Sequence, residues 1–198
     1  MNRELTYQSF VGAQIASVFE PLAALRIAVF RSFPYLYEGR VDYEMDYLKT
    51  YEESPKALLF AVFYNGRMVG ATTASPLADE AEEVQAPFVA AGYRLEDVFY
   101  FGESILLPEY RSLGIGHRFF DEREKHVRSF GRFKYMCFCA VQRPADHPDR
   151  TSDYQPLDVF WKKRGYKPIQ ELITTFSWPD IGETESTAKS MLFWLKEL

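Results

Sequence analysis

A junction between an apolar run and a segment with helical periodicity constrains the fold of this chain most strongly. Residues 98–107 form a nearly continuous apolar run, Pro108 ends it, and apolar residues then recur at helical intervals from Gly114 to Gly131. Such a run is typical of a central strand covered on both faces, and the periodic segment is typical of a helix with one buried face. We therefore expect a buried strand, a turn and an amphipathic helix.

The remaining segments predict a mixed α/β protein. Asn65-Gly66 lies between two apolar runs and is a strong signal for a β-hairpin, while Pro21 is expected to kink the first helix or to restart it in its first turn. We expect strands at residues 5–10, 57–64, 68–74, 133–141 and 169–178, and helices at 15–29, 43–51, 78–84, 157–164 and 184–198. The helix at 78–84 would belong to an acidic insertion at about 77–96, and the last helix would be core or a homodimer face.

Length and charge limit the number of domains and the kinds of partner. The 198 residues, 47% of them hydrophobic, suffice for one substantial core, so residues 1–198 are expected to form a single domain. A formal net charge of -5 argues against binding along a nucleic-acid backbone. We find no stretch of about 20 uncharged apolar residues and no signal-peptide pattern, so we expect a cytoplasmic protein without a membrane partner.

The two cysteines agree with a reducing compartment. Cys137 and Cys139 are two residues apart on an expected strand, which is too close for an ordinary disulfide or zinc pair. We expect buried, reduced thiols, and a reactive thiol near a substrate is the alternative. The three scattered histidines show no metal triad, so no metal is expected.

The turn from Arg111 to Gly116 has the chemistry of an anion site. The first N–H groups of a helix have no partner within it and lie at the positive end of its dipole, so a phosphate binds there. Gly114 and Gly116 remove side chains that would hold an anion away, and Arg111 adds a cation. The alternative is that the glycines only open the turn or allow close packing. The spacing does not match the nucleotide loops of ATP- or NAD-binding folds.

Two motifs resemble the GNAT superfamily of N-acetyltransferases. Arg111, Gly114 and Gly116 match its Arg/Gln-x-x-Gly-x-Gly/Ala signature, and the preceding Leu-Leu-Pro-Glu-Tyr at 106–110 is similar to its Val-x-Pro-x-Tyr. Phe-Trp-Lys-Lys-Arg-Gly-Tyr at 160–166 is similar to its Phe-Tyr-x-Lys-x-Gly-Phe block. The resemblance covers most of the chain, apart from the insertion and the C-terminal helix.

The resemblance implies the GNAT acyl-CoA N-acyltransferase fold, a mixed and mostly antiparallel sheet flanked by helices and splayed where acetyl-CoA (coenzyme A) binds. It implies that the backbone of Ile105, Leu106 and Leu107 pairs with the pantetheine arm. The pyrophosphate would be held by the amides of Arg111, Ser112, Leu113, Gly114, Ile115 and Gly116, and the other wall would be lined by Trp161 and Lys163.

Acetyl transfer requires a neutral amine, so a base must take its proton. Glu103 is the candidate, since it is the one ionisable residue in the apolar run; the alternative is a structural ion pair with a buried Arg or Lys. Trp161 stands where the family often has a tyrosine that protonates the leaving thiolate, and an indole does not titrate usefully. Tyr154 is the substitute acid unless its ring only packs, or the thiolate leaves as an anion stabilised by local donors.

Two loops are candidates for the acceptor site. Arg143 is suited to a substrate carboxylate and His147 to proton transfer, although their proline-stiffened loop is equally consistent with internal salt bridges. In the aromatic loop at 33–39, Tyr35, Tyr37 and Glu38 would embrace a cationic amine or else cap the core.

These patterns together predict an acetyl-CoA-dependent N-acetyltransferase that acts on a primary amine of a small molecule or peptide. The first alternative is a non-catalytic acyl-CoA-binding sensor or scaffold, and the second is a different nucleotide-binding α/β protein. Trp161 favours the sensor, whereas Glu103 favours the enzyme.

Overall fold

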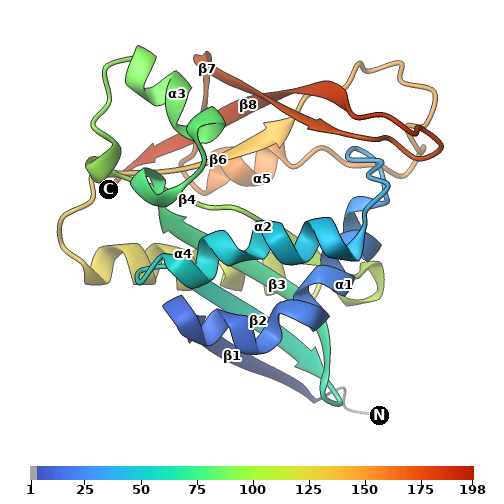
Figure 1. Ribbon diagram of the computed structural model, residues 1–198, viewed down its shortest axis with the longest axis horizontal. Helices are drawn as coiled ribbons and strands as arrows, with labels where there is room; N and C mark the ends of the chain where they lie inside the picture. The colour runs from blue at the N-terminus through green and yellow to red at the C-terminus, as the bar shows by residue number, and fades with distance from the viewer. Residues whose placement is uncertain (1–3) are drawn as a thin grey trace.

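The computed structural model describes residues 4–198, which form one mixed sheet with helices on both faces (Figure 1). The strands are β1 Leu5–Val11, β2 Leu58–Tyr64, β3 Arg67–Pro76, β4 Val98–Tyr100, β5 Ser104–Leu106, β6 Tyr135–Val141, β7 Lys167–Trp178 and β8 Thr187–Glu197. The helices are α1 Phe19–Phe30, α2 Val41–Glu53, α3 Glu82–Ala90, α4 Ile115–Ser129 and α5 Asp158–Lys163, with short 3-10 segments at Gly12–Val18, Leu77–Asp79, Leu95–Asp97 and Pro108–Tyr110.

The sheet has the order β1-β2-β3-β4-β6-β8-β7, with β5 paired to β3 beside this path. Among the strand pairs within residues 4–198, only β4–β6 is parallel, so the mixed and mostly antiparallel sheet is confirmed. Helices α1, α2 and α3 cover the face nearest the viewer in Figure 1, while α4 and α5 lie behind it. The alternating side chains of the central strands therefore pack into a separate core on each face.

The first hairpin and the first helix form as the sequence predicts. Asn65 and Gly66 both have positive φ, 50° and 78°, as the tight turn between β2 and β3 requires. Pro21 lies in the first turn of α1, where its missing N–H costs nothing, so the predicted restart is confirmed.

One helical stretch approaches the length and composition of a membrane span, although it contains the charged residues Glu20 and Arg26. Gly12–Phe30, a 3-10 turn followed by α1, is one helical stretch of 19 residues that is long and apolar enough to cross a membrane. This is a weak indication, because the core helix of a globular protein meets the same criterion. Here Leu22 and Leu25 lie in the core, and Arg26 is buried on the same helix.

The predicted C-terminal helix at 184–198 is wrong, because this segment contains strand β8, which lies between β6 and β7 in the sheet. Met191 and Phe193 face the core on one side, and Trp194 faces the core on the other. A strand buried on both faces has apolar residues at every spacing, including the three- and four-residue intervals of a helix. Hydrophobic periodicity alone could not distinguish a helix from a strand buried on both faces.

The helix expected at 78–84 begins later, at Glu82, and Pro87 lies inside it rather than beyond it. Proline has no N–H to donate to the carbonyl four residues earlier, which is that of Glu83. The hydroxyl of Thr174 in β7 donates to this carbonyl instead. The neighbouring strand thus satisfies the acceptor that the proline leaves free.

Glu80, between the 3-10 turn and α3, is expected to make stability depend on pH. Burial raises its pKa from 4.5 to about 7, although the Ser75 hydroxyl donates to it. Between about pH 4.5 and 7 the unfolded chain has released a proton that the folded chain still holds, so stability falls as the pH rises through this window. Glu80→Gln should remove this pH dependence of stability and raise the free energy of unfolding at pH 8 by about 3 kcal/mol.

Urea unfolding at pH 5, 6, 7 and 8 measures the effect. Glu82→Gln is the matched control, because Glu82 is exposed in the same segment and should leave the pH slope unchanged. An unchanged slope in Glu80→Gln would show that Glu80 ionises with an ordinary pKa.

Candidate functional site

A gap opens in the sheet where β4 ends. The last bond between the two central strands joins the Phe101 N–H to the Cys137 carbonyl at 2.7 Å. Beyond it β5 pairs with β3 and β6 pairs with β8, so β5 and β6 diverge. The expected splay of the sheet is confirmed at this point.

One extra residue causes the divergence. Ser75 pairs with Tyr100, and Thr72 pairs with Ser104, so three residues, 101–103, lie opposite two residues of β3. This is a β-bulge, which bends a strand away from its neighbour. It also explains why the apolar run at 98–107 forms two short strands and not the single strand that we expected.

Gly102 makes the bulge sterically feasible. Its N–H donates to the Thr73 carbonyl at 3.2 Å. A Cβ at position 102 would lie 2.6 Å from the Thr73 Oγ1 and closer still to the Tyr51 hydroxyl. No larger residue fits between the bulge and α2 without displacing one of them.

The backbone of β5 presents alternate groups to the gap. The Glu103 carbonyl accepts from β3, the Leu107 N–H donates to β3, and Ile105 lies in register with Ala71. In an antiparallel pair the intervening residues point the other way, so Ser104 and Leu106 turn their main-chain groups toward the gap. Of the three residues expected to pair with pantetheine, Ile105 and Leu107 are thus engaged with β3, and Leu106 faces the gap.

The turn before α4 forms a concave set of backbone donors. Ser112 and Gly114 have positive φ, 61° and 78°, and the first N–H of the helix that has a backbone acceptor is that of Arg118, bonded to the Gly114 carbonyl at 3.2 Å. Within residues 4–198, no protein oxygen accepts from the N–H groups of residues 112–117. Successive free donors at a helix N-terminus suit a phosphate.

The two glycines of this turn have different roles. Gly114 adopts a left-handed conformation that strains other residues, whereas Gly116 is the second residue of α4. A Cβ on Gly116 would find its nearest neighbour, the Phe160 ring, at 4.0 Å. Close helix packing therefore does not explain Gly116, and its missing side chain leaves the donors of residues 112–117 accessible. Arg111 is exposed beside them and adds a positive charge.

The comparison with known proteins rests on this architecture and on the sequence. The acetyltransferase (GNAT) family profile matches residues 23–150, well over half of the chain. The chain belongs to the GNAT family. No curated protein sequence matches it.

Solved GNAT structures share the fold at low sequence identity. NAA60 from Arabidopsis thaliana in complex with a bisubstrate analogue has a TM-score of 0.61 and 11% identity, covering 98% of this chain and 99% of that one. An N-acetyltransferase from Staphylococcus aureus Mu50 has a TM-score of 0.60 and 10% identity, covering 97% and 98%. The ribosomal-protein-alanine N-acetyltransferase of Brucella melitensis has a TM-score of 0.60 and 12% identity, covering 98% and 99%. These likenesses show the GNAT fold.

The second GNAT motif lies on α5, behind the sheet. The Trp161 ring packs against Phe138 and Trp194, with ring centroids 5.0 Å apart in both cases. Trp161 thereby anchors α5 to β6 and β8. Lys163 is exposed at the end of the helix, free to meet a ligand from solvent.

Glu103 forms the buried ion pair that was the alternative to a catalytic base. One carboxylate oxygen contacts the Arg26 guanidinium, and the other accepts from the Tyr51 hydroxyl at 2.7 Å and from the Thr73 hydroxyl. Arg26 also pairs with Glu44, which is fully buried. The carboxylate is therefore directed into a network that joins α1, α2 and the bulge.

This network contains residues that the sequence analysis missed. Glu44, Tyr47 and Tyr51 recur at three- and four-residue spacing on one face of α2, and Arg26 is a lone cation within an apolar helix. A polar stripe on a buried helix face and a single charge in an apolar run are both signals of buried ion pairs. Neither signal identifies the residue that completes the ion pair, because that residue is distant in the sequence.

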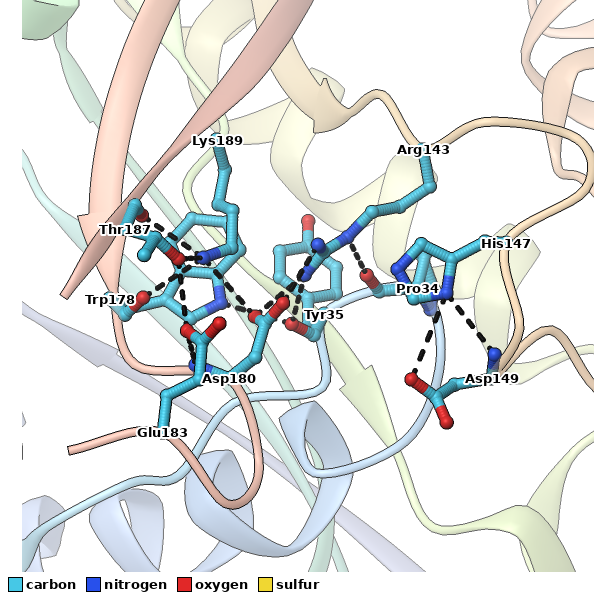
Figure 2. A network of polar contacts seen from close by, with 10 residues as sticks. All are labelled: Pro34, Tyr35, Arg143, His147, Asp149, Trp178, Asp180, Glu183, Thr187 and Lys189. Atoms are coloured by element: carbon cyan, nitrogen blue, oxygen red, sulfur yellow. Dashed lines mark hydrogen bonds and ion pairs between the residues drawn. The ribbon is translucent and has the colours of Figure 1, made fainter. Parts of the chain in front are cut away.

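Arg143 forms a salt bridge, but its partner lies outside its own loop. Figure 2 shows its guanidinium between Asp180, held through both carboxylate oxygens at 2.8 and 2.9 Å, and the carbonyls of Pro34 and Tyr35, each at 2.9 Å. Lys189 approaches Asp180 from the other side at 3.3 Å. Burial favours a raised pKa for Asp180, but the two cations hold it below its usual range. Arg143 thus joins the aromatic loop to the β7–β8 hairpin and is not free to bind a substrate carboxylate.

His147 and Tyr154 lie together against the aromatic loop. The Phe33 ring contacts His147 at 5.6 Å and Tyr154 at 4.7 Å between centroids, and Arg150 stacks on Tyr154. The His147 Nδ1 accepts from the Asp149 N–H at 3.2 Å. The Tyr154 ring thus packs against the loop, and burial raises the pKa of its hydroxyl. Within residues 4–198, no group of three His, Cys, Asp or Glu side chains is placed to hold a metal ion.

The aromatic loop divides its three candidate residues between surface and interior. Glu38 forms an exposed ion pair with Arg31 at 2.7 Å. Tyr37 is buried, and its pKa is raised by burial and by the nearby charge of Glu44. Tyr35 stacks on Trp178, and burial raises its pKa although part of the side chain is exposed. Tyr35 thus stays partly accessible, whereas Tyr37 belongs to the interior.

Proposed function

We propose that this protein transfers an acetyl group from acetyl-CoA to a primary amine of a small molecule or peptide by direct attack on the thioester. The observation that carries the proposal is a set of backbone groups on one stretch of chain. The amides of residues 112–117 have no acceptor within residues 4–198, and Ser104 and Leu106 face the gap beside the bulge at 101–103. The amides suit the pyrophosphate, and the main-chain groups of Ser104 and Leu106 suit the pantetheine amides. Bound acetyl-CoA would supply the activated acyl carbon.

The residues around the gap have distinct parts in this proposal. Glu103, through Arg26 and Tyr51, fixes the bulge and so the width of the gap. The amine must lose a proton before or during attack, and water carries it away because the Glu103 carboxylate is turned into its network. The catalytic-base hypothesis for Glu103 predicts a much larger loss of kcat in Glu103→Gln than a positioning role does.

A non-catalytic acyl-CoA sensor is the second candidate. Glu103 is held in an ion pair and so is not an evident base, and Trp161 packs against other rings and offers no titratable acid. Release of free CoA, followed with a thiol reagent across a panel of amines, separates the two functions. The panel includes a peptide with N-terminal alanine, since one structural relative is named a ribosomal-protein-alanine N-acetyltransferase. We expect CoA release that depends on at least one amine. Tight CoA binding without turnover on any amine favours the sensor, and no CoA binding contradicts both.

A further inference from the structure

Two side chains meet at the point where the sheet opens. Tyr100 is the last residue of β4, and Cys139 is the first residue of β6 beyond the last β4–β6 bond whose side chain lies on the α3-covered face. The Tyr100 hydroxyl and the Cys139 Sγ are 3.3 Å apart. The contact therefore bridges the mouth of the gap, where the acyl end of a bound acyl-CoA would emerge.

Tyr100 keeps its proton near neutral pH. Burial, the Cys139 contact and the nearby Tyr47 and Glu80 all raise the pKa of its hydroxyl. Burial also raises the pKa of Cys139 to about 12, so this thiol stays neutral too. A thiol is a weak hydrogen-bond partner, whereas a thiolate is a charged and stronger acceptor. The Tyr100 hydroxyl is thus a donor with only a weak present partner.

Two further tyrosines lie near the pair. Tyr35 and Tyr47 are each partly exposed, and both are close enough to Cys139 for their charges to interact with it. Tyr47 also lies near Tyr100. The buried pair is therefore next to side chains that reach the surface.

Other candidates for a donor to the leaving sulfur are engaged elsewhere. Trp161, at the position of the family tyrosine, packs with Phe138 and Trp194 on the opposite face of the sheet. Tyr154 packs against Phe33 in the loop. The positions of these two rings leave the mouth of the gap to Tyr100.

We propose that the Tyr100 hydroxyl, oriented by Cys139, donates a hydrogen bond to the sulfur of CoA as the C–S bond breaks. This inference rests on the proposed acetyl transfer. The amine nitrogen forms the new C–N bond and loses a proton to water, while the electron pair of the C–S bond moves to sulfur. The thiolate leaves stabilised by Tyr100 and takes a proton from water afterwards, so Tyr100 remains neutral throughout.

Tyr100→Phe removes the hydroxyl and little volume. A hydrogen bond to a charged group at a buried site supports a loss of about 10- to 100-fold in kcat, with KM for acetyl-CoA unchanged within about twofold. Tyr93→Phe is the matched control, because the Tyr93 ring packs on the same face of the sheet but against Phe88 and Tyr135, at the end of β6 far from the gap, and it should retain kcat. Equal kcat in the parent and in Tyr100→Phe would overturn the proposal.

A second measurement does not require turnover. The pKa of the thiol of bound CoA, followed by thiolate absorbance, should be about one pH unit lower in the parent than in Tyr100→Phe. No difference overturns the role of Tyr100 even if no amine substrate is found. A parent protein that binds CoA with this lowered thiol pKa and yet acetylates no amine would contradict the proposed function and leave the Tyr100 contact supported.

Cys139→Ala separates orientation from covalent catalysis. Because the thiol only orients Tyr100 in our proposal, we expect kcat to fall by less than about fivefold. Loss of all turnover, together with an acetyl adduct on Cys139 in the parent by mass spectrometry, would show a covalent route and overturn the proposal.

Discussion

Replacing Gly116 with Asp is expected to weaken CoA binding by about 100-fold or more while leaving α4 as stable or more stable. A carboxylate at the second helical residue interacts favourably with the helix dipole, worth about 0.3–1 kcal/mol, and removes a glycine from the helix. The same carboxylate would lie among the amides of residues 112–117, which we propose as the pyrophosphate site. Two like charges about 4 Å apart near a protein surface repel by about 4 kcal/mol. Binding and stability should therefore change in opposite directions.

Calorimetric titration with CoA and thermal unfolding without ligand measure the two effects. Gly116→Asn is the matched control, because it adds the same volume without the charge and should lose less affinity. Raising the salt concentration should narrow the difference between the two variants, since salt screens the repulsion. CoA affinity of Gly116→Asp within threefold of the parent would contradict the assignment of this turn to the pyrophosphate.

Replacing Arg26 with Met is expected to destabilise the protein by about 3–5 kcal/mol at pH 7. The substitution leaves Glu44 and Glu103 buried without their shared cation. An isolated buried carboxylate has a raised pKa, so the folded variant would bind protons that the unfolded chain has released. Its stability should then fall as the pH rises above about 4.3 and recover toward acid.

Urea unfolding from pH 5 to 8 measures both the loss and its pH dependence. Arg31→Met is the matched control, since Arg31 forms an exposed pair with Glu38 and should cost about 0–1 kcal/mol. Adding Glu44→Gln and Glu103→Gln to Arg26→Met should recover much of the loss, because no buried charge then remains. A loss below about 1 kcal/mol in Arg26→Met would show that water reaches the network.

Short sequence patterns predicted correctly the turns and helix starts that depend on residues adjacent in the chain. Asn65-Gly66 specifies its hairpin through positive φ, and Pro21 marks the first turn of α1. The glycines at 114 and 116 likewise act within one turn of the chain. Such features are readable because the groups involved are adjacent in sequence.

The errors arose where burial on both faces removed the periodic signal. Strand β8 has apolar side chains in two cores, so the spacing of its apolar residues resembles that of a helix. The bulge at 101–103 was hidden inside a continuous apolar run, since an extra residue changes pairing without changing composition. The helix expected at 78–84 stopped short of Pro87, because the hydroxyl that satisfies the carbonyl left free by this proline belongs to Thr174, on a distant strand.

The sequence by itself determined the GNAT resemblance, the expected anion site at 111–116 and the presence of one unusual carboxylate, Glu103. Only the tertiary structure decided that Glu103 pairs with Arg26, that Arg143 holds two loops together, and that Tyr100 meets Cys139 at the gap. The physical reason is the range of the interactions. A turn is specified by dihedral preferences of adjacent residues, whereas the partner of a buried charge is whichever group the packing of distant elements brings within about 4 Å of it.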